Sequence, residues 1–545
     1  MMTTSAAPVP PSGRRAAPRL RVFAVAVTLG ACSRGSAPAR QELAPTANLP
    51  ADIVTGNVRA RIDSTLQSFV TSGRVAGVSA LIYEKDREVY FNTFGYADRE
   101  ARRPMSRNTI VQIFSMTKPV TGVALMSLHE QGKLQLDDLL SKHAPEFAKL
   151  RVYAGTDSTG APVLVEPRRP VTVRDLTRHT AGFATNQNNP GVGPLLRTAD
   201  PMNRSNTLTQ MAERLATVPL WFHPGEKWEY GPSVDVQAFL VERISGQPFE
   251  RYLEQHIFTP LRMRETRYFV PEADRARLAA VYLRRQDSVL ARMPDQEVQA
   301  FATTRAALTP GGYGLTSTLD DYMRFARMLL NGGELDGARV LHPETVRLMA
   351  TNHLSEDVKE RSWLPGKGQV GFGIDVAVRT RPPASAAENN GVVGEFFWDG
   401  AASTLFWVDP TNRLAAVLFV QLLPFDPIGL HKRFRDAVYG PVSPNQEQRI
   451  PEESRAQRSA RNDKRASRKA VEFGRSSPNT DASSPRKTSA PASSVKRSVT
   501  AYVTFGRIAT PRGPAYATAA HSVSSVSCSH LYDARIDAPC CVRRV

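Results

Sequence analysis

The stretch IFSMTKPVTGVALMSLHEQGKL occupies residues 113–134 and carries the pattern that decides the fold. An apolar approach ends at Ser115, and apolar residues at helical spacing follow it. Because residues three apart lie on one side of a helix, Lys118 can place its amine beside the Ser115 hydroxyl. Ser115 is also expected near the helix N-terminus, where its N–H lacks an intrahelical partner and the dipole favours a developing oxyanion. One turn therefore offers a nucleophile, a candidate base and an oxyanion donor.

The Ser-x-x-Lys spacing alone is a weak signal. Ordinary serine and lysine usage gives roughly one or two chance matches in a chain of this length. Two further matches do occur, at Ser484 with Lys487 and at Ser493 with Lys496, and both lie in a low-complexity segment. The assignment of Ser115 therefore depends on partners elsewhere in the chain.

A first partner is Tyr230, within the stretch WFHPGEKWEYGPSVDVQAFLVERISGQPF at residues 221–249. It stands just before a segment with helical apolar spacing. A phenol near the end of a loop can point into a cleft, share a proton with Lys118, and act as base for Ser115 and as acid for a leaving group. The alternative is a core tyrosine whose hydroxyl contacts water.

A second partner is the run Trp398-Asp399-Gly400-Ala401, which we place on an edge strand. Gly400 would let the backbone approach a ligand closely, and the Ala401 N–H can complete an oxyanion hole. An ordinary glycine at a strand bulge is the alternative.

The pattern along the chain predicts an α+β sandwich, in which an antiparallel sheet is flanked by helices. Strand patterns occur near both ends of the domain, and the interval from about residue 120 to 390 is mostly helical in pattern, so distant segments must complete one sheet around a large helical insert. The terminal segments are a helix at 57–73, strands at 77–86, 87–98, 394–400, 403–410 and 413–421, and a helix at 430–439.

Composition changes beyond about residue 440. Residues 441–545 are rich in Ser, Arg, Pro, Lys and Ala without helical or strand period, and we expect a disordered basic tail. The formal net charge is +18. About +10 of it lies in this tail and about +4 in residues 1–31, so the domain at 57–440 is nearly neutral. That domain contains no basic stripe with interleaved aromatics, which argues against a nucleic-acid partner.

The N-terminal segment predicts export. Arginines precede the apolar run VFAVAVTLGA at residues 22–31, which is the order of a secretory signal peptide spanning residues 1–31. The run ends at Cys32 in a Leu-Gly-Ala-Cys sequence that resembles the lipobox of bacterial lipoproteins. We expect a periplasmic or outer-membrane-anchored lipoprotein, attached to a membrane only through Cys32 and the flexible tether 32–56. A plain cleaved signal, or a cysteine that stands there by chance, is the alternative.

Taken together, these motifs resemble the serine β-lactamase and penicillin-binding-protein superfamily, and especially the family VIII carboxylesterases and transesterases. The resemblance covers roughly residues 57–440 and includes VTVRDLTRHTAGF, where His179 to Gly182 is similar to the family's "HTSG" stretch. It implies that Ser115 is the nucleophile, Lys118 its proton-sharing partner and Tyr230 the general acid/base. The N–H groups of Ser115 and Ala401 would form the oxyanion hole.

Two departures from the β-lactamase pattern bear on the substrate. The Tyr-x-Asn motif appears as Tyr230-Gly231-Pro232, so the amide that would bind a β-lactam side chain is missing. The Lys-Thr-Gly motif is replaced by Trp398-Asp399-Gly400, which removes the cation that pairs with a substrate carboxylate. Both changes favour small neutral ester substrates, with Trp398 and Gly400 as substrate-binding residues.

Other chemistries are disfavoured. The ten histidines show no paired metal-ligand spacing, so we expect no metal and no cofactor, and His179 and His223 are interpreted as structural. A Ser-His-Asp hydrolase would need a Gly-x-Ser-x-Gly motif, which is absent. The run Gly311-Gly312-Tyr313-Gly314 is interpreted as a turn. A β-lactamase or D-aminoacyl peptidase acting on amides, and a non-catalytic cell-envelope binding protein, remain the alternatives to an esterase.

Overall fold

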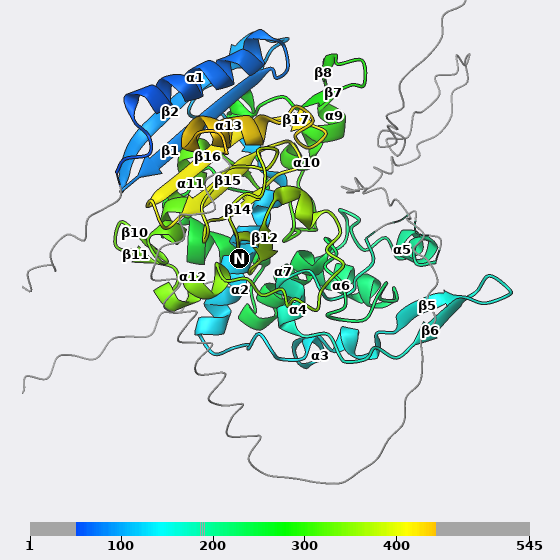
Figure 1. The fold of residues 1–545 in the computed structure, drawn as a ribbon. Coiled ribbons are helices and arrows are strands. Elements are labelled where there is room, and N and C mark those ends of the chain that lie inside the picture. The colour runs from blue at the N-terminus through cyan, green and yellow to red at the C-terminus, as the bar shows by residue number, and fades with distance from the viewer. Residues whose placement is uncertain (1–50, 186, 188, 190, 443–545) are drawn as a thin grey trace, which may run out of the picture. The chain divides into compact units, whose positions relative to one another are not determined.

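The computed structural model describes residues 51–185, 187, 189 and 191–442 (Figure 1). The predicted signal peptide 1–31 and Cys32 lie outside the described residues, as does the predicted tail except for residues 441 and 442. Residues 51–56 are the described part of the predicted tether. There the backbone N–H groups of Ile53 and Val54 donate to the Glu84 carboxylate at 2.6 and 3.1 Å. No helix in the described ranges is long and apolar enough to cross a membrane.

An antiparallel sheet of eight strands forms the centre of the domain, in the order β12-β13-β14-β15-β16-β1-β2-β3. β1 pairs with β16, which places Ala80 opposite Leu418. The two ends of the domain therefore complete one sheet, as the sequence predicts. Its strands are β1 (Gly77–Glu84), β2 (Arg87–Asp98), β3 (Arg103–Pro104), β12 (Val370–Phe372), β13 (Ala377–Arg379), β14 (Phe396–Asp399), β15 (Leu405–Asp409) and β16 (Leu414–Val420).

Helices cover both faces of this sheet (Figure 1). Successive side chains of a strand point to opposite faces. On β15, Phe406 packs against Tyr322 of α11 (Leu319–Leu330) at a ring-centroid distance of 5.2 Å. The next residue, Trp407, packs against Phe434 of α13 (Leu430–Tyr439) at 5.4 Å. α11 and α13 therefore lie on opposite faces, and α1 (Gly56–Thr71) packs beside α13.

Most of the regular elements between β3 and β12 are helices, and together with the antiparallel sheet they confirm the predicted fold class. Its helices are α2 (Thr117–Glu130), α3 (Leu140–His143), α4 (Val173–Thr177), α5 (Gly193–Ala199), α6 (Leu208–Ala216), α7 (Ser233–Ser245), α8 (Phe249–Leu253), α9 (Asp295–Val298), α10 (Ala300–Thr303), α11 and α12 (Pro343–Met349). Short turns of helix are η1 (Phe114–Met116), η2 (Pro145–Lys149), η3 (Glu254–Phe258), η4 (Glu272–Arg277) and η5 (Leu364–Lys367). Minor strands are β4 (Val111–Gln112), β5 (Val152–Thr156), β6 (Pro162–Val165), β7 (Tyr282–Arg284), β8 (Leu290–Arg292), β9 (Thr316–Ser317), β10 (Glu334–Leu335), β11 (Ala338–Arg339) and β17 (Leu422–Leu423).

The prediction that Trp398 to Ala401 lie on an edge strand is wrong, because β12 and β13 extend the sheet beyond β14. These two strands have three residues each, too short for an alternating pattern to stand out within a helical interval. β13 pairs only with Phe396 and Phe397 of β14. Within the described residues, the Trp398–Asp399 end of β14 therefore has no strand partner on its outer side.

Candidate active site

Ser115 lies in a strained turn that links β4 to α2. The residue before it, Phe114, has a φ of 47°, a left-handed conformation that is unusual for a residue with a side chain. The turn is held from both sides: the Thr117 hydroxyl donates to the Phe114 carbonyl at 2.7 Å, and the Tyr322 hydroxyl donates to the Met116 carbonyl at 2.8 Å. α2 begins at Thr117, so Ser115 lies near a helix N-terminus as the sequence predicts.

Lys118 is buried and points its amine at the Ser115 hydroxyl. Its Nζ lies 3.2 Å from Ser115 Oγ and donates to the Gly312 carbonyl at 2.7 Å. Burial lowers the pKa of Lys118 to about 8, although the negative charges of nearby aspartates act in the opposite direction. A lysine with this pKa is partly neutral near pH 7, so it can accept a proton from Ser115.

The loop Gly311–Gly314 forms the other side of the Lys118 environment. The Gly312 N–H donates to Asp235 Oδ1 of α7 at 2.9 Å. A Cβ at Gly312 would lie only 3.3 Å from Lys118 Nζ and 3.1 Å from Asp235 Oδ2. Because Gly312 has no side chain, the loop can approach both groups closely. Burial raises the pKa of Asp235 to about 6. The run interpreted as a simple turn therefore connects the lysine to a buried carboxylate, a role that no local pattern indicates.

Tyr230 lies beside both Ser115 and Lys118, within a group of aromatic rings. Its ring centroid is 4.4 Å from Lys118 Nζ, 4.8 Å from the His179 ring and 5.6 Å from the Trp398 ring. Burial raises the pKa of Tyr230 well above its ordinary value, while the side chains of Ser115 and Trp398 act in the opposite direction. Tyr230 therefore stays a phenol at neutral pH and can donate a proton. Because a hydrogen bond with the Ser115 side chain lowers this pKa, the Tyr230 hydroxyl lies within reach of Ser115.

Two neighbours of Tyr230 support this arrangement. His179 is buried, and burial lowers its pKa well below the ordinary value, so the ring is neutral and packs as an aromatic group. Its Nδ1 accepts from the Gly231 N–H at 3.4 Å, which agrees with the structural role predicted for this histidine. Trp398 is 1% exposed, and its indole N–H has no hydrogen-bond partner at ordinary geometry in the described part of the chain. That N–H is therefore available to a charge that develops on the Tyr230 oxygen.

Gly400 packs against the turn that carries Ser115. A Cβ at this position would lie 2.5 Å from the Ile113 carbonyl oxygen and 2.3 Å from the Thr404 hydroxyl. The space that a side chain at Gly400 would need is therefore filled by the protein's own backbone, two residues before Ser115. This contact holds the end of β14, and with it Ala401, next to the turn that carries Ser115.

One residue of this region was missed by sequence reasoning. Lys367, in η5, forms an ion pair with Asp399, and the two side chains are 9% and 10% exposed. Loss of the Lys-Thr-Gly motif predicted that no cation would remain here, yet a lysine from a different segment occupies the neighbourhood. The two residues are 32 positions apart with no motif between them, so only the tertiary fold brings them together.

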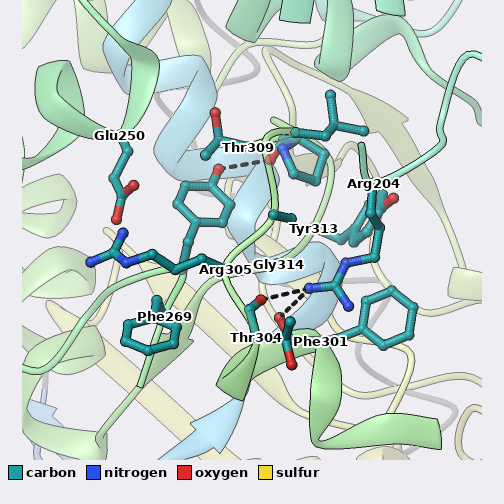
Figure 2. A pocket seen from close by; sticks show the side chains of 13 residues that line it. Arg204, Glu250, Phe269, Phe301, Thr304, Arg305, Thr309, Tyr313 and Gly314 are labelled. Atoms are coloured by element: carbon teal, nitrogen blue, oxygen red, sulfur yellow. Dashed lines mark hydrogen bonds between the residues drawn. The ribbon is translucent and has the colours of Figure 1, made fainter. Parts of the chain in front are cut away.

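A separate cavity borders the far end of the Gly311–Gly314 loop (Figure 2). It has a volume of about 40 Å³, and its lining includes Tyr313, Arg204 and Arg305. Arg204 donates to the Thr304 carbonyl at 2.8 Å, as Figure 2 shows. This space suits one or two water molecules, and none of the proposed catalytic side chains lines it. It is therefore not the substrate site. The described residues contain no group of three or more His, Cys, Asp or Glu side chains placed to hold a metal ion.

The fold, with a serine, a lysine and a tyrosine gathered at one end of a buried helix, defines a serine hydrolase. The Beta-lactamase family model matches residues 62–439, and the chain belongs to that family. Protein Rv1367c of Mycobacterium tuberculosis is 34% identical over 366 residues, which cover 66% of this chain and 89% of that protein. Esterase EstB of Burkholderia gladioli is 28% identical over 404 residues, which cover 70% of this chain and 95% of that protein. The structure of EstCE1, described as a hydrolase with promiscuous acyltransferase activity, superposes with a TM-score of 0.57 at 27% identity. The superposition covers 70% of this chain and 99% of EstCE1.

Proposed function

We propose that this enzyme cleaves carboxylic esters through an acyl-enzyme on Ser115 and can pass the acyl group to an alcohol as well as to water. The observation that carries the proposal is the 3.2 Å contact between Lys118 Nζ and Ser115 Oγ, made by a buried lysine whose pKa is about 8. Similarity to esterase EstB and to EstCE1, whose descriptions name ester hydrolysis and acyl transfer, supports it.

Acylation begins with proton transfer from Ser115 to Lys118. The Ser115 Oγ attacks the ester carbonyl carbon, and the carbonyl oxygen becomes an oxyanion near the N–H groups of Ser115 and Ala401. When the C–O bond to the alcohol breaks, the Tyr230 phenol protonates the departing alkoxide. The Tyr230 phenolate then takes back a proton from the Lys118 ammonium, which leaves an acyl-enzyme with both groups in their starting states. The Trp398 side chain, which lowers the pKa of Tyr230, stabilises the transient phenolate.

Deacylation follows the same path in reverse. Water or an alcohol occupies the place of the departed alcohol and gives its proton to the Lys118–Tyr230 pair as its oxygen attacks the acyl carbon. The bond to Ser115 breaks, and the Ser115 oxygen recovers a proton from Lys118. Because a water molecule and an alcohol enter at the same position, the concentration of the alcohol decides how much product is a new ester.

Two features favour esters over β-lactams. Pro232 stands where the β-lactamase motif has an asparagine, so no side-chain amide is present to bind a β-lactam side chain. The nearby cation, Lys367, is already paired with Asp399, so it does not offer a free charge to a β-lactam carboxylate. A neutral ester needs neither contact.

The test compares 4-nitrophenyl acetate and butyrate with the β-lactam nitrocefin. We expect turnover of both esters and little of nitrocefin, with Ser115→Ala inactive on all three at an unchanged melting temperature. A fluorophosphonate should label the wild type and not this variant. Faster hydrolysis of nitrocefin than of either ester would support a β-lactamase, and neither turnover nor labelling would support a non-catalytic binding protein.

A further inference from the structure

The ion pair of Lys367 and Asp399 occupies an aromatic enclosure. Lys367 Nζ lies 4.7 Å from the centroid of the Phe425 ring, 5.0 Å from that of Trp398 and 5.2 Å from that of Trp363. Such distances allow cation–π attraction, and the Asp399 carboxylate completes the set of partners. The carboxylate and the three rings thus surround the amine of Lys367.

This pair lies beside the catalytic groups. Asp399 directly precedes Gly400, whose backbone packs against Ile113 and the nucleophile's turn. The negative charge of Asp399 reaches Lys118 and Tyr230, where it favours the ammonium and disfavours the phenolate. The Trp398 ring that contacts Lys367 also contacts Tyr230. A substrate bound along the unpaired end of β14 would therefore lie close to this pair.

We propose that Asp399 determines the charge preference of the enzyme by neutralising Lys367, so that the site selects uncharged substrates. This inference rests on the proposed ester chemistry at Ser115. A substrate carboxylate that approaches Lys367 must displace Asp399 and leave that buried carboxylate without its partner. With asparagine at position 399, the shape of the side chain is kept but the competing charge is gone. Lys367 then becomes a free cation facing the substrate.

Matched substrates measure this effect. We would compare kcat/KM for 4-nitrophenyl hexanoate with that for mono-4-nitrophenyl adipate, which has the same acyl length and a terminal carboxylate. The wild type should prefer the hexanoate. In Asp399→Asn the adipate-to-hexanoate ratio should rise about tenfold or more, because a charge-assisted hydrogen bond becomes available. The double variant Asp399→Asn/Lys367→Met should lose that gain. A ratio that is unchanged in Asp399→Asn, or a gain that survives in the double variant, would overturn the proposal.

A binding measurement separates this inference from the proposed function. Boronic acids bond reversibly to an activated serine and need no ester turnover. Calorimetric Kd values for phenylboronic acid and 3-carboxyphenylboronic acid should show the same shift towards the carboxylated ligand in Asp399→Asn, abolished in the double variant. If this shift appears while no ester is cleaved, the ester function fails and the role of Asp399 stands. If esters are cleaved and neither measurement shifts, the role of Asp399 fails alone. Circular dichroism and melting temperature confirm that each variant is folded.

Discussion

Replacing Asp235 with asparagine should make the enzyme relatively more active near neutral pH. Asp235 is one of three aspartates whose charge favours the ammonium form of Lys118, and it is the first in magnitude. A Cβ added at Gly312 would lie 3.3 Å from Lys118 Nζ and 3.1 Å from Asp235 Oδ2, so these two atoms can be no more than 6.4 Å apart. Asparagine keeps an oxygen that can accept from the Gly312 N–H, so the loop keeps its anchor.

The magnitude follows from that separation. Two unit charges about 6 Å apart at an effective dielectric constant of about 20 attract by about 3 kcal/mol, which corresponds to about two pKa units. Relaxation and bound water reduce this, and we expect a downward shift of about one unit. The sign is set by the base: removing a negative charge disfavours the ammonium and lowers the Lys118 pKa. The shift applies above about pH 6, where Asp235 is ionised.

The assay is the pH dependence of kcat/KM for 4-nitrophenyl butyrate. In the wild type the rate should rise with pH and level off above about 8, since neutral Lys118 accepts the Ser115 proton. About one tenth of the plateau rate is expected at pH 7, and about one half in Asp235→Asn. Asp375→Asn is the control. Burial raises the pKa of Asp375 well above its ordinary value, so this substitution removes less negative charge, and the pH at which kcat/KM rises should shift less. If the pH at which kcat/KM rises is unchanged or higher in Asp235→Asn, Lys118 is not the base.

Four further changes test other parts of the structure. Tyr230→Phe should lower kcat for ester hydrolysis by about 10²- to 10⁴-fold with little change in melting temperature, since it removes the leaving-group acid. Gly400→Ala should cost about 1–3 kcal/mol in urea unfolding and reduce kcat/KM, whereas Gly366→Ala, where an added Cβ would meet no atom within 4 Å, should do neither. Glu395→Ala should cost about 3–5 kcal/mol in the same unfolding assay, because it leaves two buried arginines without their carboxylate. Cys32→Ala should release the protein from the membrane fraction of expressing cells; equal retention of both forms would argue against a lipid anchor at this residue.

The parts of the structure that were predictable from sequence are those with a local cause. The helix at 430–439 follows from the helical spacing of its buried residues, and the strands at 77–84 and 414–420 follow from short apolar runs that are buried almost throughout. Ser115 and Lys118 meet because they are three positions apart at the junction of η1 and α2, so their side chains lie on one side of the helix. Tyr230 was found through its place before a helix and through family resemblance. β12 and β13 could not be predicted, because a strand of three residues is too short to show an alternation of apolar and polar side chains.

What could not be predicted is the charge environment of the site, and the reason is geometric. Lys118 acquires its pKa from burial and from carboxylates on α7, on β14 and in the segment before β13, which chain folding alone brings within reach. The position of Lys367 depends on the tertiary fold in the same way. The Lys-Thr-Gly motif of the family reads Trp398-Asp399-Gly400 here, yet Lys367 of η5 lies beside Trp398 and is paired with Asp399. A motif therefore identifies which residue attacks, whereas substrate charge preference depends on contacts between residues that no motif links. Substitution of Asp399, and not restoration of the missing lysine, is accordingly the change that should convert a site for neutral esters into one that accepts anionic ones.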